Sequence, residues 1–208
     1  MAKLSEIRKA VSYHLVTPLV KPLASLGISP DALSWTGFGL ALVAAFLIAR
    51  GYLLAGGIMV LVAASFDMLD GALARHTGKV SRFGGILDST LDRLSEATLL
   101  VGILVLFLTH GDNSRLFWPL SHNWAIVILA LVLIFSPLVS YLRARAEAAG
   151  FDCQLGIFTR TERVIVLVLG LLFNQLVIAL ALIAVLSVFT AGQRLLLIWR
   201  KTRSEPSA

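Results

Sequence analysis

Four aspartates in the stretch 65–96 are the residues best suited to do chemistry. Asp67 and Asp70 are three residues apart, and Asp88 and Asp92 are four apart, so each pair shares one face of a helix. An ionised side chain inside a bilayer commonly costs about 2.5 to 3.5 kcal/mol unless a partner compensates it. Oxygen ligands select a hard ion such as Mg²⁺, Mn²⁺ or Ca²⁺. The spacing therefore predicts a metal site between two membrane helices, with Asp67, Asp70, Asp88 and Asp92 as ligands.

The depth of these carboxylates favours one shared site. Arg75 and Arg82 mark where the two apolar helices must meet the polar interface. At 1.5 Å per residue, the four aspartates lie roughly 8 to 15 Å below that interface. An alternative interpretation is that each carboxylate pairs with a nearby arginine, for which Arg75, Arg82 and Arg93 are candidates. That alternative does not explain why the two pairs share one depth.

Small residues follow the same helix faces and complete a longer motif. Gly71, Ala74 and Gly84 are spaced so that a neighbouring helix, or the phosphates of a ligand, can approach the backbone closely. The whole pattern is D-x-x-D-G-x-x-A-R-x₈-G-x₃-D-x₃-D, which runs from Asp67 to Asp92. This pattern resembles the signature of the CDP-alcohol phosphatidyltransferases, which are integral membrane enzymes of phospholipid synthesis.

The resemblance implies a reaction and a set of site residues. A hydroxyl of the acceptor would attack the lipid-side phosphorus of CDP-diacylglycerol and expel CMP, with two Mg²⁺ or Mn²⁺ ions held by the four aspartates. Asp92 would be the general base. Pro30-Asp31-x-x-Ser34 also matches a stretch that lies near the nucleotide in that family, although capping of the first membrane helix is the ordinary role of Asp31. The predicted nucleotide contacts are Asp31, Ser34, Asp67, Gly71, Ala74, Arg75 and Gly84.

A second group of charged residues is cationic and follows the motif in the sequence. Arg143 and Arg145 end the fourth apolar run, and Arg160 and Arg163 follow in the next loop. Basic residues in loops are typical of membrane topology, so for any one arginine that interpretation is as good as ligand binding. Together, however, Arg143, Arg160, Arg163 and Arg194 could surround a phosphate, which suits the forked guanidinium group.

The sequence around these arginines narrows the resemblance. Ser140-Tyr141-x-Arg143-Ala-Arg-Ala-Glu147, followed by Arg160-x-Glu-Arg163, is similar to the branch that uses inositol 1-phosphate as its acceptor. The resemblance therefore implies a phosphorylated polyol as the second substrate. Glycerol 3-phosphate, another phosphorylated polyol, or a donor of the CDP-inositol type remain alternatives.

The composition explains where these residues must lie. The chain has 208 residues, of which 58% are hydrophobic and 14% charged, which is typical of an all-α integral membrane protein. Six apolar runs predict six transmembrane helices. They lie at about 32–49, 54–74, 84–108, 123–142, 160–173 and 176–199.

The fifth run is short for a crossing, yet the charges favour one. With six crossings, 16 of the 18 Lys and Arg residues fall on one side, and only Arg50 and Arg115 lie opposite. The positive-inside rule then places both termini and the aspartates on the cytoplasmic side of the cell membrane. A tight turn is expected near Asn174 and Gln175.

The remaining segments complete the predicted organisation. Residues 1–24 carry Leu4, Ile7, Val11 and Leu15 at helical spacing, which predicts an amphipathic helix in the cytoplasmic interface. Residues 25–203 would form the membrane domain and 204–208 a tail. The resemblance implies a homodimer, and we expect no nucleic-acid partner. A cation transporter is a distant alternative, because the outer halves of the second and third runs offer no polar route.

Overall fold

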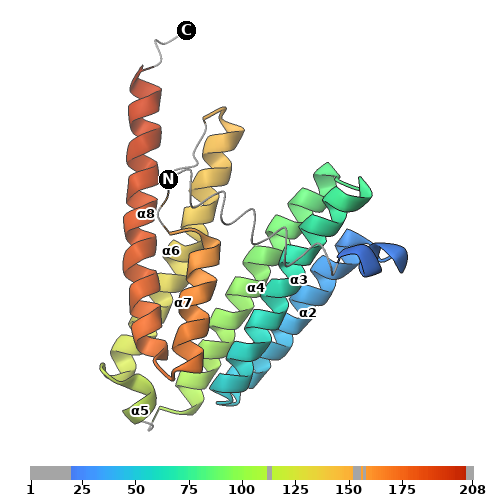
Figure 1. Ribbon diagram of the computed structural model, residues 1–208. Coiled ribbons are helices and arrows are strands. Elements are labelled where there is room, and N and C mark those ends of the chain that lie inside the picture. Colours follow the sequence, from blue (N-terminus) through green and yellow to red (C-terminus); the bar gives the residue numbers. More distant parts are fainter. Residues whose placement is uncertain (1–19, 112–113, 152–155, 157, 205–208) are drawn as a thin grey trace. The chain divides into compact units, whose positions relative to one another are not determined.

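The computed structural model describes residues 20–111, 114–151, 156 and 158–204. The described residues form helices joined by short connections and contain no strand (Figure 1). The helices are α2 (Pro30–Ala49), α3 (Leu53–Thr77), α4 (Arg82–Thr109), α5 (Ser114–Phe117), α6 (His122–Ala148), α7 (Arg160–Leu172) and α8 (Leu176–Ser204). The first 19 residues of the predicted interfacial helix lie outside the described part, as do the last four residues of the predicted tail.

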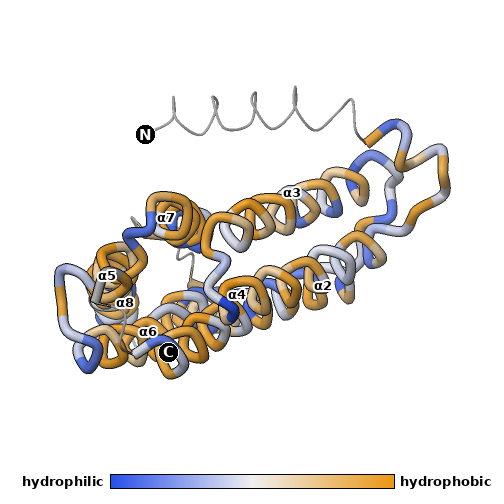
Figure 2. The backbone as a smooth tube through the Cα atoms, turned by 90° about the horizontal axis from the view of Figure 1, so that it is seen from below, coloured by the Kyte–Doolittle hydropathy of each residue, from blue (hydrophilic) through white to orange (hydrophobic). Residues whose placement is uncertain are grey.

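Each of the six predicted apolar runs forms a helix. Four of these helices, α2, α3, α6 and α8, are long and apolar enough to cross a membrane. The apolar colour runs along them in Figure 2. The helix α4 is also long, at 28 residues, but it carries the charged residues Asp88, Asp92, Arg93 and Glu96. The helix α7 has 13 residues and rises only about 20 Å, which is short of a hydrocarbon core of about 30 Å.

Large apolar side chains point outward from these helices. Phe46, Ile134 and Val185 are 59%, 60% and 67% exposed. A protein in water rarely leaves so many large apolar groups uncovered, whereas lipid tails solvate them well. The chain is therefore a multi-pass membrane protein built of helices.

The described chain divides into two compact units, and the aspartate motif falls in the first. Among the described residues this unit comprises 20–44 and 59–99, and so contains the beginning of α2, most of α3 and the beginning of α4. Its core is formed by the buried residues Val20, Leu33 and Leu73. A Cβ added at Gly37 would lie 3.4 Å from that of Phe66. The missing side chain therefore lets α2 lie close to α3 beside the site.

The second unit comprises residues 45–58 and 100–208. In it, α6 and α7 pack against α8. A Cβ added at Gly170 would overlap the Cβ of Ala179, so only glycine allows α7 and α8 to pack this closely. The predicted turn lies between these helices, where Asn174 has a φ of 55° and Gln175 donates from its N–H to the carbonyl of Gly170 at 2.7 Å.

Candidate functional site

Three of the four predicted aspartates come together between α3 and α4. The carboxylates of Asp67, Asp70 and Asp88 offer oxygens that lie within 4.8 Å of one another. Asp70 is 4% exposed, and the other two are half-buried. Helical spacing places Asp67 and Asp70 on one face of α3, and Asp88 reaches them from the first turns of α4. Three converging carboxylates fit a hard divalent ion such as Mg²⁺ or Mn²⁺.

Asp70 is held in place from two directions. The hydroxyl of Ser34 on α2 donates to Oδ2 of Asp70 at 2.5 Å. The backbone N–H of Gly71 donates to Oδ1 of the same carboxylate at 2.5 Å. The site is therefore built from the three helices α2, α3 and α4. Ser34, which the sequence predicts to contact the nucleotide, donates a hydrogen bond to one of the aspartates.

A cavity of about 270 Å³ opens beside the carboxylates, within the first unit. It is lined by six of the seven predicted nucleotide contacts, all except Asp67, together with Asp70 and Asp88. The predicted contacts that line it are Asp31, Ser34, Gly71, Ala74, Arg75 and Gly84. The motif residues thus surround one space large enough for the polar part of a ligand.

The glycines of the motif have specific neighbours in this cavity. A Cβ at Gly71 would lie 3.3 Å from Nη1 of Arg75, so the guanidinium group lies across the helix backbone there. A Cβ at Gly84 would lie 3.0 Å from the hydroxyl oxygen of Ser81 and 3.5 Å from Oδ1 of Asp31. Gly71 therefore leaves room for the guanidinium of Arg75 on α3, and Gly84 lets Asp31 of α2 approach the start of α4.

Lys79 and Ser81 also line the cavity, and the sequence analysis did not identify them. Both lie in the connection between α3 and α4, where Gly78 has a φ of 67° and Lys79 donates from its N–H to the carbonyl of Ala74 at 3.0 Å. The hydroxyl oxygen of Ser81 accepts from the N–H of Gly84 at 2.8 Å. A serine directly before the first residue of a helix is a preferred N-cap, and this signal could have identified Ser81.

Asp92 is not part of the group of three found among the described residues. It lies one helical turn beyond Asp88 on α4 and is half-buried. Glu96 continues this face by another turn and is also half-buried. The structure thus separates the four predicted aspartates into three close carboxylates and one farther along α4.

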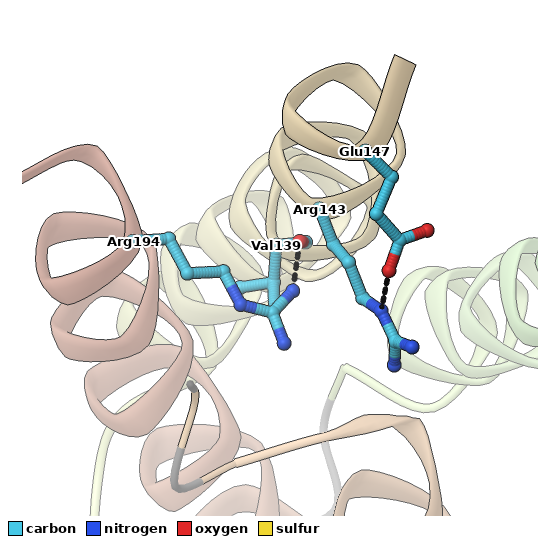
Figure 3. A network of polar contacts seen from close by, with 4 residues as sticks. All are labelled: Val139, Arg143, Glu147 and Arg194. Atoms are coloured by element: carbon cyan, nitrogen blue, oxygen red, sulfur yellow. Dashed lines mark hydrogen bonds and ion pairs between the residues drawn. The ribbon is translucent and has the colours of Figure 1, made fainter. Parts of the chain in front are cut away.

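The four predicted arginines all belong to the second unit. Arg163 and Arg194 are 2% and 3% exposed, and Arg160 is half-buried. The side chain of Arg143 is 50% exposed, and its Nε lies 2.8 Å from the carboxylate of Glu147 (Figure 3). The guanidinium of Arg194 donates to the carbonyl of Val139 on α6 (Figure 3).

The start of α7, which carries two of these arginines, is capped by a neighbouring side chain. The N–H of Thr159 donates to Oε2 of Glu162 at 2.8 Å, and the hydroxyl of Thr159 also donates to this oxygen. A glutamate that accepts from the N-cap residue three positions earlier stabilises the first turn of a helix. The backbone that carries Arg160 and Arg163 is therefore well defined.

Comparisons with known proteins identify relatives of this chain. Residues 28–192 match the sequence model of the family described as CDP-alcohol phosphatidyltransferase. The chain is 43% identical over 192 residues to the archaetidylinositol phosphate synthase of Pyrococcus horikoshii, covering 92% of this chain and 94% of that protein. It is 34% identical over 209 residues to the phosphatidylinositol phosphate synthase of Mycobacterium marinum, covering 96% of this chain and 86% of that protein.

The structure is also similar to solved ones. The crystal structure of Mycobacterium tuberculosis phosphatidylinositol phosphate synthase with CDP-DAG bound matches with a TM-score of 0.80 and 31% identity, covering 94% of this chain and 99% of that chain. A structure of the same enzyme in complex with manganese and citrate also gives a TM-score of 0.80, covering 93% of both chains.

Proposed function

Because the chain belongs to the CDP-alcohol phosphatidyltransferase family, we propose that it transfers a phosphatidyl group from CDP-diacylglycerol to a hydroxyl of inositol 1-phosphate. The observation that carries this proposal is the group of three aspartates beside a cavity lined by the rest of the motif. The names of the mycobacterial and archaeal relatives support an inositol phosphate acceptor. The relative with CDP-DAG bound supports the donor.

The metal centre fits this chemistry. Mg²⁺ or Mn²⁺ is the cofactor, and when bound it neutralises the diphosphate and the charge on the leaving oxygen. Two ions are proposed, with Asp67, Asp70 and Asp88 as the closest group of ligands and Asp92 as the fourth. Ser34 keeps Asp70 in one orientation by its hydrogen bond, as the partners of metal ligands commonly do.

The cavity suits the nucleotide rather than the whole donor. Its volume of about 270 Å³ is slightly below the usual range of ligand pockets, about 300 to 1,000 Å³. The cytidine and diphosphate would occupy it, and the acyl chains would stay in the lipid. Arg75 offers a fork of N–H donors to the phosphates, and Gly71, Ala74 and Gly84 let them approach the backbone. Asp31 and Ser34 would lie beside the cytidine.

Asp92 is proposed as the general base. It would take the proton of the acceptor hydroxyl as that oxygen forms its bond to the lipid-side phosphorus. The bond from this phosphorus to the oxygen of the CMP phosphate breaks, and CMP leaves with the electron pair. A placed base typically contributes about 10² to 10⁴ in rate. Arg143, Arg160, Arg163 and Arg194 would bind the phosphate of the acceptor.

The same proposal includes the placement of the protein in the membrane. Six crossings, by α2, α3, α4, α6, α7 and α8, put both termini and the site on the cytoplasmic side, where the acceptor is dissolved and into which CMP is released. The distribution of Lys and Arg residues supports this orientation. The assembly is proposed to be a homodimer, as the family resemblance implies.

The first experiment measures CMP release by the purified protein with CDP-diacylglycerol and Mg²⁺ or Mn²⁺. Inositol 1-phosphate, free inositol, glycerol 3-phosphate and serine are compared as acceptors, with Asp92→Asn alongside. Release only with inositol 1-phosphate, abolished in the variant, supports the acceptor and the base. Release with another acceptor keeps the metal chemistry and overturns the proposed acceptor. A parallel assay with a CDP-linked archaetidyl donor tests which lipid the donor carries.

A further inference from the structure

The guanidinium group of Arg194 lies directly against the backbone of Gly156. A Cβ added at Gly156 would lie 2.7 Å from Nη2, 3.0 Å from Nε and 3.2 Å from Cζ of Arg194. Real Cβ atoms essentially never approach another heavy atom within 3.0 Å. Any side chain at position 156 therefore requires the guanidinium, or the connection between α6 and α7, to move.

Arg194 has little freedom to move away. It is 3% exposed, and its Nη1 donates to the carbonyl of Val139 (Figure 3). Displacing the guanidinium would break this hydrogen bond inside the protein, where an unmade bond to a charged group is costly. An exposed arginine could swing into solvent instead, but this one is enclosed by α6, α8 and Gly156. The contact with Gly156 therefore limits where the charged guanidinium of Arg194 can lie.

Arg143 shows the contrasting case in the same unit. Its side chain is 50% exposed, and its partner Glu147 is 47% exposed and four residues away on the same helix. Exposed pairs of this kind contribute little and are readily exchanged for another anion. The position of Arg143 therefore does not depend on Gly156, which makes Arg143 a useful reference.

We propose that Gly156 is a positioning residue for Arg194. This inference rests on the proposed function, in which Arg194 binds the phosphate of the acceptor. A guanidinium group binds phosphate through two parallel N–H donors, so the plane of the group determines the strength of binding. The guanidinium lies against the backbone of Gly156 and donates to the carbonyl of Val139. These two contacts hold the plane of the group fixed. Glycine at position 156 thus contributes to recognition of the acceptor without touching it.

The first test is Gly156→Ala, with Gly192→Ala as the matched control. Gly192 lies on α8, two residues before Arg194, and an added Cβ there meets no described atom within 4 Å. For Gly156→Ala, we expect the KM for inositol 1-phosphate to rise about tenfold, which corresponds to about 1.4 kcal/mol. The KM for CDP-diacylglycerol should be unchanged. Gly192→Ala should leave both values as they are.

A double-mutant cycle with Arg194→Ala separates this role from a general change in the loop. The φ of Gly156 is 159°, so alanine there can also carry a backbone cost, but that cost is the same with or without the guanidinium. If Gly156 acts through Arg194, Gly156→Ala raises the KM for the acceptor only when Arg194 is present. The same factor in both backgrounds would overturn the proposal.

A second readout distinguishes failure of this inference from failure of the proposed function. The melting temperature in detergent is measured for the same four proteins, with Arg194→Lys replacing Arg194→Ala if the alanine variant does not fold. Non-additive melting temperatures support the contact between Gly156 and the guanidinium, and additive ones overturn it. If Arg194→Ala leaves the KM for the acceptor unchanged, Arg194 does not bind the acceptor phosphate. The melting temperatures alone then show whether Gly156 acts on the guanidinium.

Discussion

Asp70 is the most buried carboxylate of the aspartate group. It is 4% exposed and accepts hydrogen bonds from the hydroxyl of Ser34 and the N–H of Gly71. A ligand that is already oriented loses little conformational freedom when an ion binds. We therefore expect Ser34 to contribute to metal affinity although it belongs to a different helix from the aspartates.

Ser34→Ala tests this contribution. We expect the apparent affinity for Mn²⁺ in CMP release to fall about tenfold or more, since loss of a ligand's hydrogen-bond partner typically costs about 10 to 100-fold. Thr36→Ala is the control, because Thr36 lies on the same helix and its exposed hydroxyl donates only to the backbone of Ala32 at 2.7 Å among the described contacts. An equal loss in both variants would contradict the role of Ser34.

The separation of Asp92 from the other three aspartates gives a second prediction. Asp88→Asn should abolish Mn²⁺ binding measured by electron paramagnetic resonance without substrates, because it removes one of three close ligands. Asp92→Asn should still bind Mn²⁺ at the group of three, while turnover falls by about 10² to 10⁴, the usual contribution of a general base. Complete loss of Mn²⁺ binding in the Asp92 variant would contradict the proposal that the other three aspartates hold an ion without it.

Sequence spacing predicted the residues that a helix positions and missed those that a turn positions. Asp67 and Asp70 share a face of α3 because α-helical geometry repeats at three and four residues. Lys79 and Ser81 reach the cavity because α3 ends at Thr77 and is followed by Gly78, a glycine of positive φ. The direction of the chain after such a turn depends on the packing of the helices on both sides, which periodicity does not encode.

The helices α7 and α8 approach each other closely through small residues. The contact between Gly170 and Ala179 replaces side-chain packing by close packing of backbones, as is common between membrane helices. Gly170 is buried on α7. The pairing of these helices therefore depends on the size of two side chains.

Gly170→Ala is expected to destabilise the protein by roughly 1 to 3 kcal/mol, the usual range for an overpacked core. Ala179→Gly in the same chain should restore part of the lost melting temperature, because it removes the methyl group that the new side chain meets. The control is Gly39→Ala on α2, where an added Cβ meets no described atom within 4 Å. Absence of rescue would show that the two residues do not limit the approach.

The helix boundaries agree closely with the apolar runs, because burial in lipid and in the protein both select apolar residues. The fifth run, predicted over 160–173, forms α7 over Arg160–Leu172. Its start could have been located from Thr159 and Glu162, which match the spacing of a capping box. The sequence could not predict which helices pack together, because the hydropathy of a run is the same whichever neighbour covers it.

At the scale of the whole protein, the number of membrane crossings depends on whether α7 spans the bilayer. Ser121, just before α6, and Thr202, near the end of α8, are both exposed. Three helices, α6, α7 and α8, lie between them in the chain. The two residues are on opposite sides of the membrane if α7 crosses and on the same side if it does not.

Single cysteines at these positions, in a Cys153→Ser background, test this topology. A membrane-impermeant maleimide should label Ser121→Cys in intact cells and Thr202→Cys only in inside-out vesicles. The native chain has one cysteine, so its replacement leaves no other reactive thiol. Labelling of both positions from the same side would remove α7 from the set of crossings.

The short α7 also bears on how the protein is synthesised. A ribosome-bound nascent chain delivers its helices to the membrane in order, and a helix that rises about 20 Å is a poor substrate for insertion alone. Its 13 residues are followed by a turn at 173–175 and by the 29 residues of α8. Under six crossings, we therefore expect α7 to insert together with α8, as one helical hairpin that is stabilised by the contact between Gly170 and Ala179.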